Sequence, residues 1–206
     1  MHYRLFSTAA LAVAVVCFAP QAEATVSITL SDNDATPTHA RVGPGGTVVL
    51  TVRLVSTAEQ TTGVDYFLRA ASGSGLFTIT DRSLVASAYP TPYFDDTVVE
   101  SPAASAALDP ANDHDLGGSV ANVNVANGTG TFVVANYTIA VAAGAPIGVY
   151  TIETFSQTGT GYVGASPAFD EAPFNSHGTF TLEVPEPASL GLFALAAGMM
   201  RRRRTH

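Results

Sequence analysis

The strongest constraint on this chain is the alternation of apolar and polar residues that runs through residues 25–184. Within 47–54, the apolar set Val48, Leu50, Val52 and Leu54 alternates with Thr47, Thr51 and Arg53. A repeat of two residues places one side chain in a core and the next in water along an extended strand. The pattern recurs at 26–30, 64–68 and 179–184, and we expect further strands at 76–80, 132–141 and 148–155. Because no stretch carries a convincing helical repeat, the sequence predicts an all-β fold, a single antiparallel β-sandwich.

Turn residues separate these alternating runs. Gly43-Pro44-Gly45-Gly46 precedes the strand expected at 47–54, and Gly144-Ala145-Pro146 precedes the one at 148–155. Gly and Pro are the residues that tight turns require. Residues 85–128 are instead rich in Ala, Pro, Asp, Asn and Gly with weak periodicity. We therefore expect a long acidic surface loop there, with room for one short strand at 97–99.

The first 24 residues have the organisation of a secretory signal peptide. Arg4 precedes an apolar run at 9–19, and Ala22-Glu23-Ala24 gives the small-x-small pattern of a cleavage site at Ala22 and Ala24. A retained membrane anchor is the alternative, but the apolar run is too short to cross about 30 Å of hydrocarbon as a helix. A lipoprotein attached through Cys17 is a weaker alternative. Small residues are expected just before a lipid-modified cysteine, but Val15 and Val16 stand there. We predict cleavage after Ala24.

The C-terminal residues 185–206 form a second targeting segment. Pro185-Glu186-Pro187 is followed by an apolar stretch at 190–200 and then by a cluster of four arginines, Arg201, Arg202, Arg203 and Arg204. The prolines force an extended backbone, and the arginines resist transfer through a bilayer and so stop export on the cytoplasmic side. An apolar helix of this length spans about 16 Å, well short of a permanent anchor. We predict a transmembrane helix that holds the chain only transiently.

These tail residues resemble the PEP-CTERM sorting tail. The resemblance covers residues 184–204 and implies that an exosortase cleaves at the processing motif Pro185, Glu186 and Pro187. It also implies export, after signal peptidase has acted, to the cell surface or extracellular space of a Gram-negative bacterium that makes exopolysaccharide.

The body between the two ends is strongly acidic. Residues 25–185 contain four arginines and fifteen Asp and Glu, a net charge of −11. Nucleic acid and anionic membrane are polyanions that such a surface repels, which makes both poor candidate partners of the body. Cations, neutral glycans and proteins remain.

The order of turns and strands in the body resembles cohesin-type and related bacterial carbohydrate-associated sandwiches. The residues that carry the resemblance are 45–47, 63–68, 130–139 and 148–152. It implies a jelly-roll, immunoglobulin-like or cohesin-like sandwich and, as one alternative function, a protein-binding module.

Catalytic motifs are not evident. No Gly-x-Ser-x-Gly elbow or His-Glu-x-x-His spacing occurs, and no pair of carboxylates stands out for glycoside hydrolysis. We expect His39, His114 and His177 to be solvated loop residues. Tyr89, Tyr93 and Phe94 lie close together in the long loop and are the aromatic residues available there for a glycan platform.

One acidic cluster has the composition of a calcium loop. Asp109, Asn112, Asp113 and Asp115 precede Gly117 and Gly118. Calcium takes six to eight oxygen ligands, which closely spaced carboxylates and amides supply. The alternative is a solvated acidic loop, because Gly117 comes early for an EF-hand and no Glu closes the loop.

Taken together, the sequence predicts a non-catalytic surface or matrix protein that functions in adhesion, exopolysaccharide association or surface structure. The alternatives are a secreted polysaccharide-acting hydrolase that uses two carboxylates, and the protein-binding module. The predicted domains are 1–24, 25–184 and 185–206.

Overall fold

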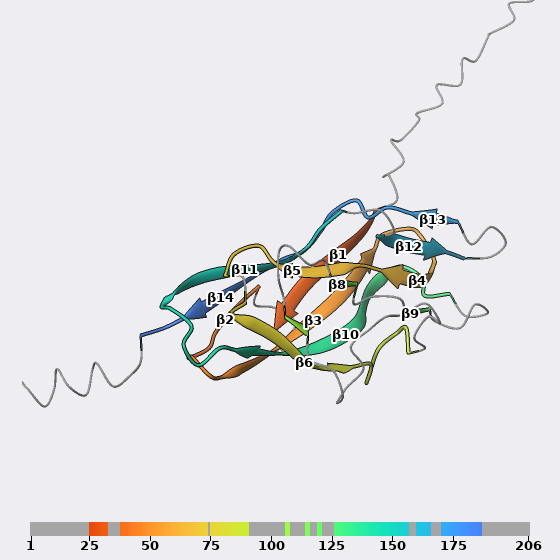
Figure 1. Ribbon diagram of the computed structural model, residues 1–206. Coiled ribbons are helices and arrows are strands. Elements are labelled where there is room, and N and C mark those ends of the chain that lie inside the picture. The colour runs from red at the N-terminus through yellow and green to blue at the C-terminus, as the bar shows by residue number, and fades with distance from the viewer. Residues whose placement is uncertain are drawn as a thin grey trace, which may run out of the picture.

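The computed structural model in Figure 1 describes residues 25–32, 38–73, 75–90, 106–107, 114–115, 119–120, 126–156, 160–165 and 170–186. Every regular element among these residues is a β-strand, which confirms the all-β prediction. In chain order the strands are β1 (Val26–Asp32), β2 (His39–Arg41), β3 (Thr47–Ser56), β4 (Thr61–Asp65), β5 (Phe67–Ala70), β6 (Phe77–Ser83), β7 (Ala106–Ala107), β8 (His114–Asp115), β9 (Ser119–Val120), β10 (Gly130–Val141), β11 (Gly148–Thr154), β12 (Gly161–Gly164), β13 (Glu171–Ala172) and β14 (Thr179–Val184).

The strands form two facing layers. One layer is the sheet β1-β3-β10-β6-β7, and the other is the sheet β2-β14-β11-β5-β8. A third sheet, β13-β12-β4-β9, extends the second layer, because β4 leads into β5 and β12 follows β11 (Figure 1). Among the described strands all pairings are antiparallel except that of β14 with β2. The antiparallel sandwich predicted from the alternation is therefore confirmed.

The core lies between the layers and is made by the inward residues of the long strands. In β3 the apolar members of the alternation are all buried, and β1 and β10 pair with it on either side. A bulge in β10 between Val133 and Ala135 interrupts the alternation, so that Val134 and Ala135 are both buried. A bulge inserts one residue into a strand and changes which residues face the core.

The strand expected at 64–68 is divided at Tyr66. β4 pairs with β12 in the third sheet, whereas β5 pairs with β11 in the second. Tyr66 lies at the division and is 1% exposed. The alternation of apolar and polar residues continues through Tyr66 without a break. The sequence therefore indicated a single strand, although the pairing partner changes at this residue.

The predicted surface loop at 85–128 begins with residues that enter the core. Tyr89 is fully buried, and its hydroxyl lies 2.6 Å from the Thr61 hydroxyl. The Ser87 hydroxyl donates to the Val134 carbonyl at 2.6 Å, and Ala88 N–H donates to the Val133 carbonyl at 2.9 Å. Tyr89 is therefore not available for an exposed aromatic platform. Tyr93, Phe94 and the strand expected at 97–99 lie outside the described residues.

Within the same segment, three two-residue strands pair with the edges of the sheets. β7 pairs with β6, β8 with β5, and β9 with β4. Short strands at sheet edges limit the unpaired backbone that a sheet offers to other chains.

The described chain begins and ends at opposite ends of the sandwich. Val26 pairs with Ser56 at the end that carries the third sheet, whereas Val184 pairs with Gly148 at the other. Figure 1 shows the long strands running between these two ends. We call the end at which β14 stops the tail-exit end. The opposite end, with Glu59, Asp65, Asp170 and Glu171 around the third sheet, is the acidic end.

Candidate functional site: the sorting tail and the acidic end

The processing motif begins where the last strand leaves the sheet. Val184 is the final paired residue of β14 and is 1% exposed, whereas Pro185 is partly exposed and Glu186 is exposed. Pro185 has no N–H to continue the ladder, so the sheet ends there. The motif is thus attached to the core through a single buried residue.

The other predicted processing residues lie outside the described residues. These are Pro187, Ala22, Ala24, Arg201, Arg202, Arg203 and Arg204. The signal cleavage site and the arginine stop therefore stay predictions. No helix in the described ranges has the length and apolar character needed to cross a membrane.

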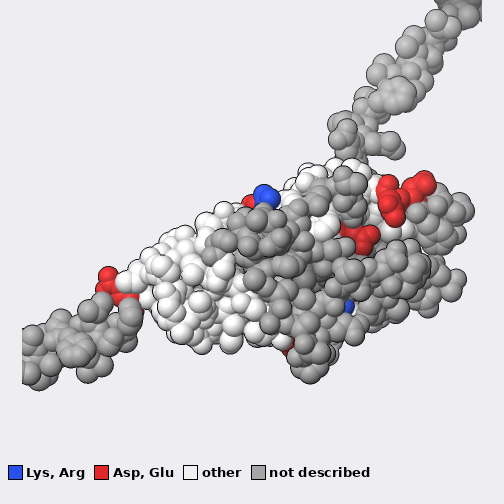
Figure 2. All heavy atoms as spheres, viewed as in Figure 1, with Lys and Arg blue, Asp and Glu red and all other residues white. Residues whose placement is uncertain are grey.

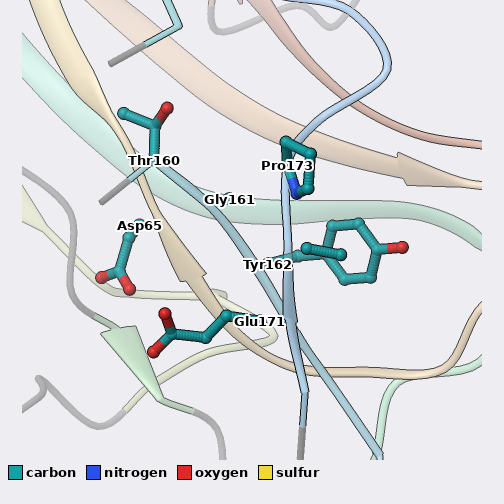
Figure 3. Close-up of a pocket in the computed structure, with 7 residues that line it drawn as sticks. Asp65, Thr160, Gly161, Tyr162, Glu171 and Pro173 are labelled. Carbon is teal, nitrogen blue, oxygen red and sulfur yellow. The ribbon is translucent and has the colours of Figure 1, made fainter. Parts of the chain in front are cut away.

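At the acidic end, the third sheet frames two hollows that share Tyr162 of β12. The first has a volume of 190 Å³ and includes Asp65, Thr160, Gly161 and Glu171 in its lining. Figure 3 shows the carboxylates of Asp65 and Glu171 turned toward each other. No local spacing in the sequence indicates this pair, because its members come from β4 and β13, which are distant in the chain.

The second hollow lies beside the first and is also acidic. Its volume is 250 Å³, and its lining includes Glu59, Gly164, Ala165 and Asp170. Both volumes are below the range of about 300–1,000 Å³ that is usual for small-molecule sites. The geometry is that of an indented surface and not of an enclosed cavity.

Aromatic contacts hold Tyr162 in place. Its ring lies 6.3 Å from that of Phe174, and Phe174 in turn contacts His177 edge-on at 5.7 Å. Burial raises the pKa of the Tyr162 hydroxyl, and the negative charge of Glu59 raises it further. The hydroxyl therefore stays protonated at neutral pH and can donate a hydrogen bond.

Gly161 sets the spacing between β12 and the chain opposite. A Cβ atom at this position would lie 2.3 Å from the Ala172 carbonyl oxygen. Only glycine permits this approach, which brings β13 and Glu171 against the hollow.

The structure tests the histidine predictions at two positions. His39 is exposed, in agreement with the prediction, although it lies in β2 and not in a loop. His177 departs from the prediction in part: the residue is partly buried, and its Nδ1 is buried without a hydrogen-bond partner among the described residues. Burial lowers the pKa of His177.

The calcium prediction falls largely on residues that the structure does not describe. Asp109, Asn112 and Asp113 lie outside the described residues, and Asp115 lies in β8, where its backbone pairs with Phe67. In the described part of the chain, no group of three or more His, Cys, Asp or Glu could hold a metal ion. The calcium site stays a prediction.

A β-sandwich body followed directly by a processing motif defines an exported protein with a sorting tail. Residues 183–204 match the family model described as the PEP-CTERM protein-sorting motif. The chain therefore carries this sorting motif, which confirms the resemblance seen in the sequence and implies processing by an exosortase after export.

Solved structures similar to the chain include several cohesins. The third ScaB cohesin of R. flavefaciens, solved with a group 1 dockerin, is 17% identical, with 82% of this chain and 100% of that chain covered and a TM-score of 0.46. The third ScaC cohesin of Acetivibrio cellulolyticus, solved with the ScaB dockerin, is 16% identical over 79% of this chain and 99% of that chain, with a TM-score of 0.48.

A non-cellulosomal cohesin of the archaeon Archaeoglobus fulgidus is 15% identical over 82% of this chain and 98% of that chain, with a TM-score of 0.43. At these identities no residue role is transferred to this chain. No curated protein sequence matches the chain.

Proposed function

We propose that this chain is a surface protein of a Gram-negative bacterium, held briefly in the inner membrane by its tail and then cleaved at Pro185-Glu186-Pro187. The body acts as a non-catalytic module in adhesion, exopolysaccharide association or surface structure. Signal peptidase and exosortase are its processing partners, and exopolysaccharide or another surface protein is the partner of the mature body.

One observation carries the proposal. The processing motif Pro185-Glu186-Pro187 begins directly after the last core residue of β14, Val184, which pairs with Gly148, and the matched residues 183–204 overlap β14 only at its last two residues. Cleavage beyond Val184 removes no strand and exposes no core side chain. The body can therefore keep its fold when the tail is exchanged or lost.

The non-catalytic role is supported by two groups whose pKa values are shifted by burial in the fold. Perturbed titratable groups often mark active sites. Here burial raises the pKa of Tyr89, which is hydrogen-bonded to Thr61 in the core, and burial lowers the pKa of His177, which contacts Phe174. Tyr162, which lines both hollows, also has a raised pKa, and burial and the charge of Glu59 account for it.

A second candidate function is a polysaccharide-acting hydrolase. The observation that favours it is the facing pair Asp65 and Glu171, since glycosidases use two carboxylates on either side of the scissile bond (Figure 3). It ranks second because the hollow is small for a ligand site.

Mass spectrometry of the protein recovered from its host tests the processing. We expect the mature chain to begin at Thr25 and to lack Arg201 to Arg204. A Glu186→Ala variant should keep its tail, because it alters the cleavage motif. Glu171→Ala is the matched control: Glu171 is exposed at the acidic end, outside the matched residues 183–204, and this variant should be processed normally. Intact arginines on the surface-exposed protein would contradict the proposal.

The role of the body is tested with exopolysaccharide from the host. A pull-down with the purified protein should recover it in complex with the polysaccharide or with another surface protein. Shortening of the polysaccharide that disappears in Asp65→Asn and Glu171→Gln would instead establish the hydrolase.

A further inference from the structure

The described tail-exit end has little charge and is partly apolar. Three of its loops, at 42–46, 71–76 and 142–148, contain no charged residue. Hydrogen bonds join the first of these loops to the strands beside it: Gly45 N–H donates to the Val141 carbonyl of β10 and Val42 N–H to the Glu183 carbonyl of β14. Figure 2 shows a largely uncharged surface toward the tail-exit end, with acidic side chains where the tail leaves it, and further acidic side chains toward the other end.

Two large apolar side chains stand exposed at the tail-exit end. Ile147 is 56% exposed in the loop, and Val149 of β11 is 67% exposed opposite Glu183. The loop that carries Ile147 is fixed, because the Tyr150 hydroxyl donates to the Pro146 carbonyl at 2.8 Å and the Tyr150 ring contacts Phe77 edge-on. The exposed apolar surface is thus held in one orientation.

The short segment between the body and the apolar stretch of the tail places this end near the membrane. The apolar stretch of the tail begins at Leu190, four residues after Glu186. Four residues span at most about 14 Å when fully extended. When the apolar stretch enters the hydrocarbon, the tail-exit end is therefore held close to the headgroup region, which is several Å deep on each side.

We propose that the tail-exit end rests on the bilayer interface, with Ile147 and Val149 against the lipid, while the tail is in the membrane. This inference rests on the proposed function, since it needs the tail to insert. The charged groups described near the contact are Glu186 and the ion pair of Arg41 with Glu183. The acidic end faces away from the bilayer, where its carboxylates keep their hydration. The contact of Ile147 and Val149 with lipid is too small to hold the body on the bilayer alone. Cleavage of the tail therefore releases the body.

The test uses the chain after signal-peptide removal, residues 25–206, in phosphatidylcholine vesicles. This form has no cysteine, so single labels can be placed by Ala143→Cys at the tail-exit end and by Ala58→Cys at the acidic end, both at exposed positions. A third label, by Ala196→Cys, reports insertion of the tail. Lipids with a quencher at the headgroup or deep in the acyl chain measure the depth of each fluorophore.

We expect headgroup quenching of the Ala143→Cys label, no quenching of the Ala58→Cys label, and deep quenching of the Ala196→Cys label. Ile147→Glu together with Val149→Glu should abolish the quenching at Ala143→Cys. Val85→Glu is the matched control, because Val85 is 78% exposed outside these loops, and should leave that quenching intact. Circular dichroism checks that each variant is folded.

Equal quenching at Ala143→Cys and Ala58→Cys with an inserted tail would overturn this inference and leave the proposed function standing. Absence of deep quenching at Ala196→Cys would overturn both. Protection of the Ala143→Cys label only in vesicles that contain exosortase would assign this end to the enzyme and not to lipid.

Discussion

The hydroxyls of Tyr66 and Tyr137 are hydrogen-bonded to each other in the core and join the two layers of the sandwich. Tyr66 lies between β4 and β5, Tyr137 lies in β10, and their rings meet edge-on with centroids 6.4 Å apart. The contact is made at the residue where the chain passes from the third sheet to the second. It therefore fixes how these sheets sit on the first.

We expect Tyr66→Phe to lower the free energy of unfolding by about 1–3 kcal/mol, because a buried hydroxyl loses a partner. Urea denaturation measures the change. Tyr66→Phe combined with Tyr137→Phe should lower the free energy of unfolding by less than the sum of the two single variants. In the double variant both hydroxyls are gone, so no buried hydroxyl has lost its partner. Tyr150→Phe removes a hydrogen bond at an exposed site and should have a smaller effect. Strict additivity of the two core substitutions would contradict a direct bond.

Gly178 should not tolerate a larger residue. A Cβ atom there would lie 2.7 Å from Leu30 N and 2.8 Å from Thr29 Cα, both backbone atoms of β1. We expect Gly178→Ala to destabilise the body by about 1–3 kcal/mol through overpacking. Gly128→Ala is the control, because no atom lies within 4 Å of its added methyl group. Equal midpoints in thermal denaturation for the two variants would refute the close approach of this loop to β1.

Stability should fall on mild acidification because of His177. Burial lowers the pKa of His177 in the folded state below the usual value of 6.5, so the unfolded chain binds the proton first. Stability from the neutral imidazole is complete above about pH 6.5 and is lost as pH falls toward the folded pKa. Melting temperatures at pH 7.5 and pH 5.5 measure this loss, and His177→Gln should reduce it. A loss of the same size in the variant would assign the effect to other groups.

Calcium should raise the melting temperature if Asp109, Asn112, Asp113 and Asp115 bind it. Binding to the folded chain stabilises it by mass action, and magnesium should act less because it prefers a tighter octahedral shell. Asp113→Ala should abolish the increase, while Asp170→Ala, an exposed acidic residue elsewhere, should not. No change between millimolar calcium and chelator would refute a structural site.

The sequence predicted the layers of the fold better than their details. The alternation in β3 and β14 identified both strands, because each has one face in the core. The bulge at Val134 and Ala135 could not be predicted, since a bulge changes the facing of residues without a marker in composition. Burial of Tyr89 was missed because its partner Thr61 is 28 residues away and the residues around it are typical of loops.

The candidate site likewise has one part that the sequence predicted and other parts that it could not predict. Pro185, Glu186 and Pro187 are contiguous, so the motif could be identified from the sequence alone. The pair Asp65 and Glu171 is assembled by β12, which lies between β4 and β13, and no local spacing indicates it. His177 could not be distinguished from a solvated loop residue, because its burial depends on Phe174 and on the strands around it.

The exit of the two chain ends from opposite ends of the sandwich has a mechanical consequence. A pull between the N-terminal end and an anchored tail would act along the strands and shear them lengthwise. The seven residue pairs of β1 with β3 and the six of β11 with β14 would then bear the load together, whereas peeling would break them one at a time. Resistance to forced unfolding depends on the rate of the first break. A tethered body of this topology is arranged to withstand drag at a surface.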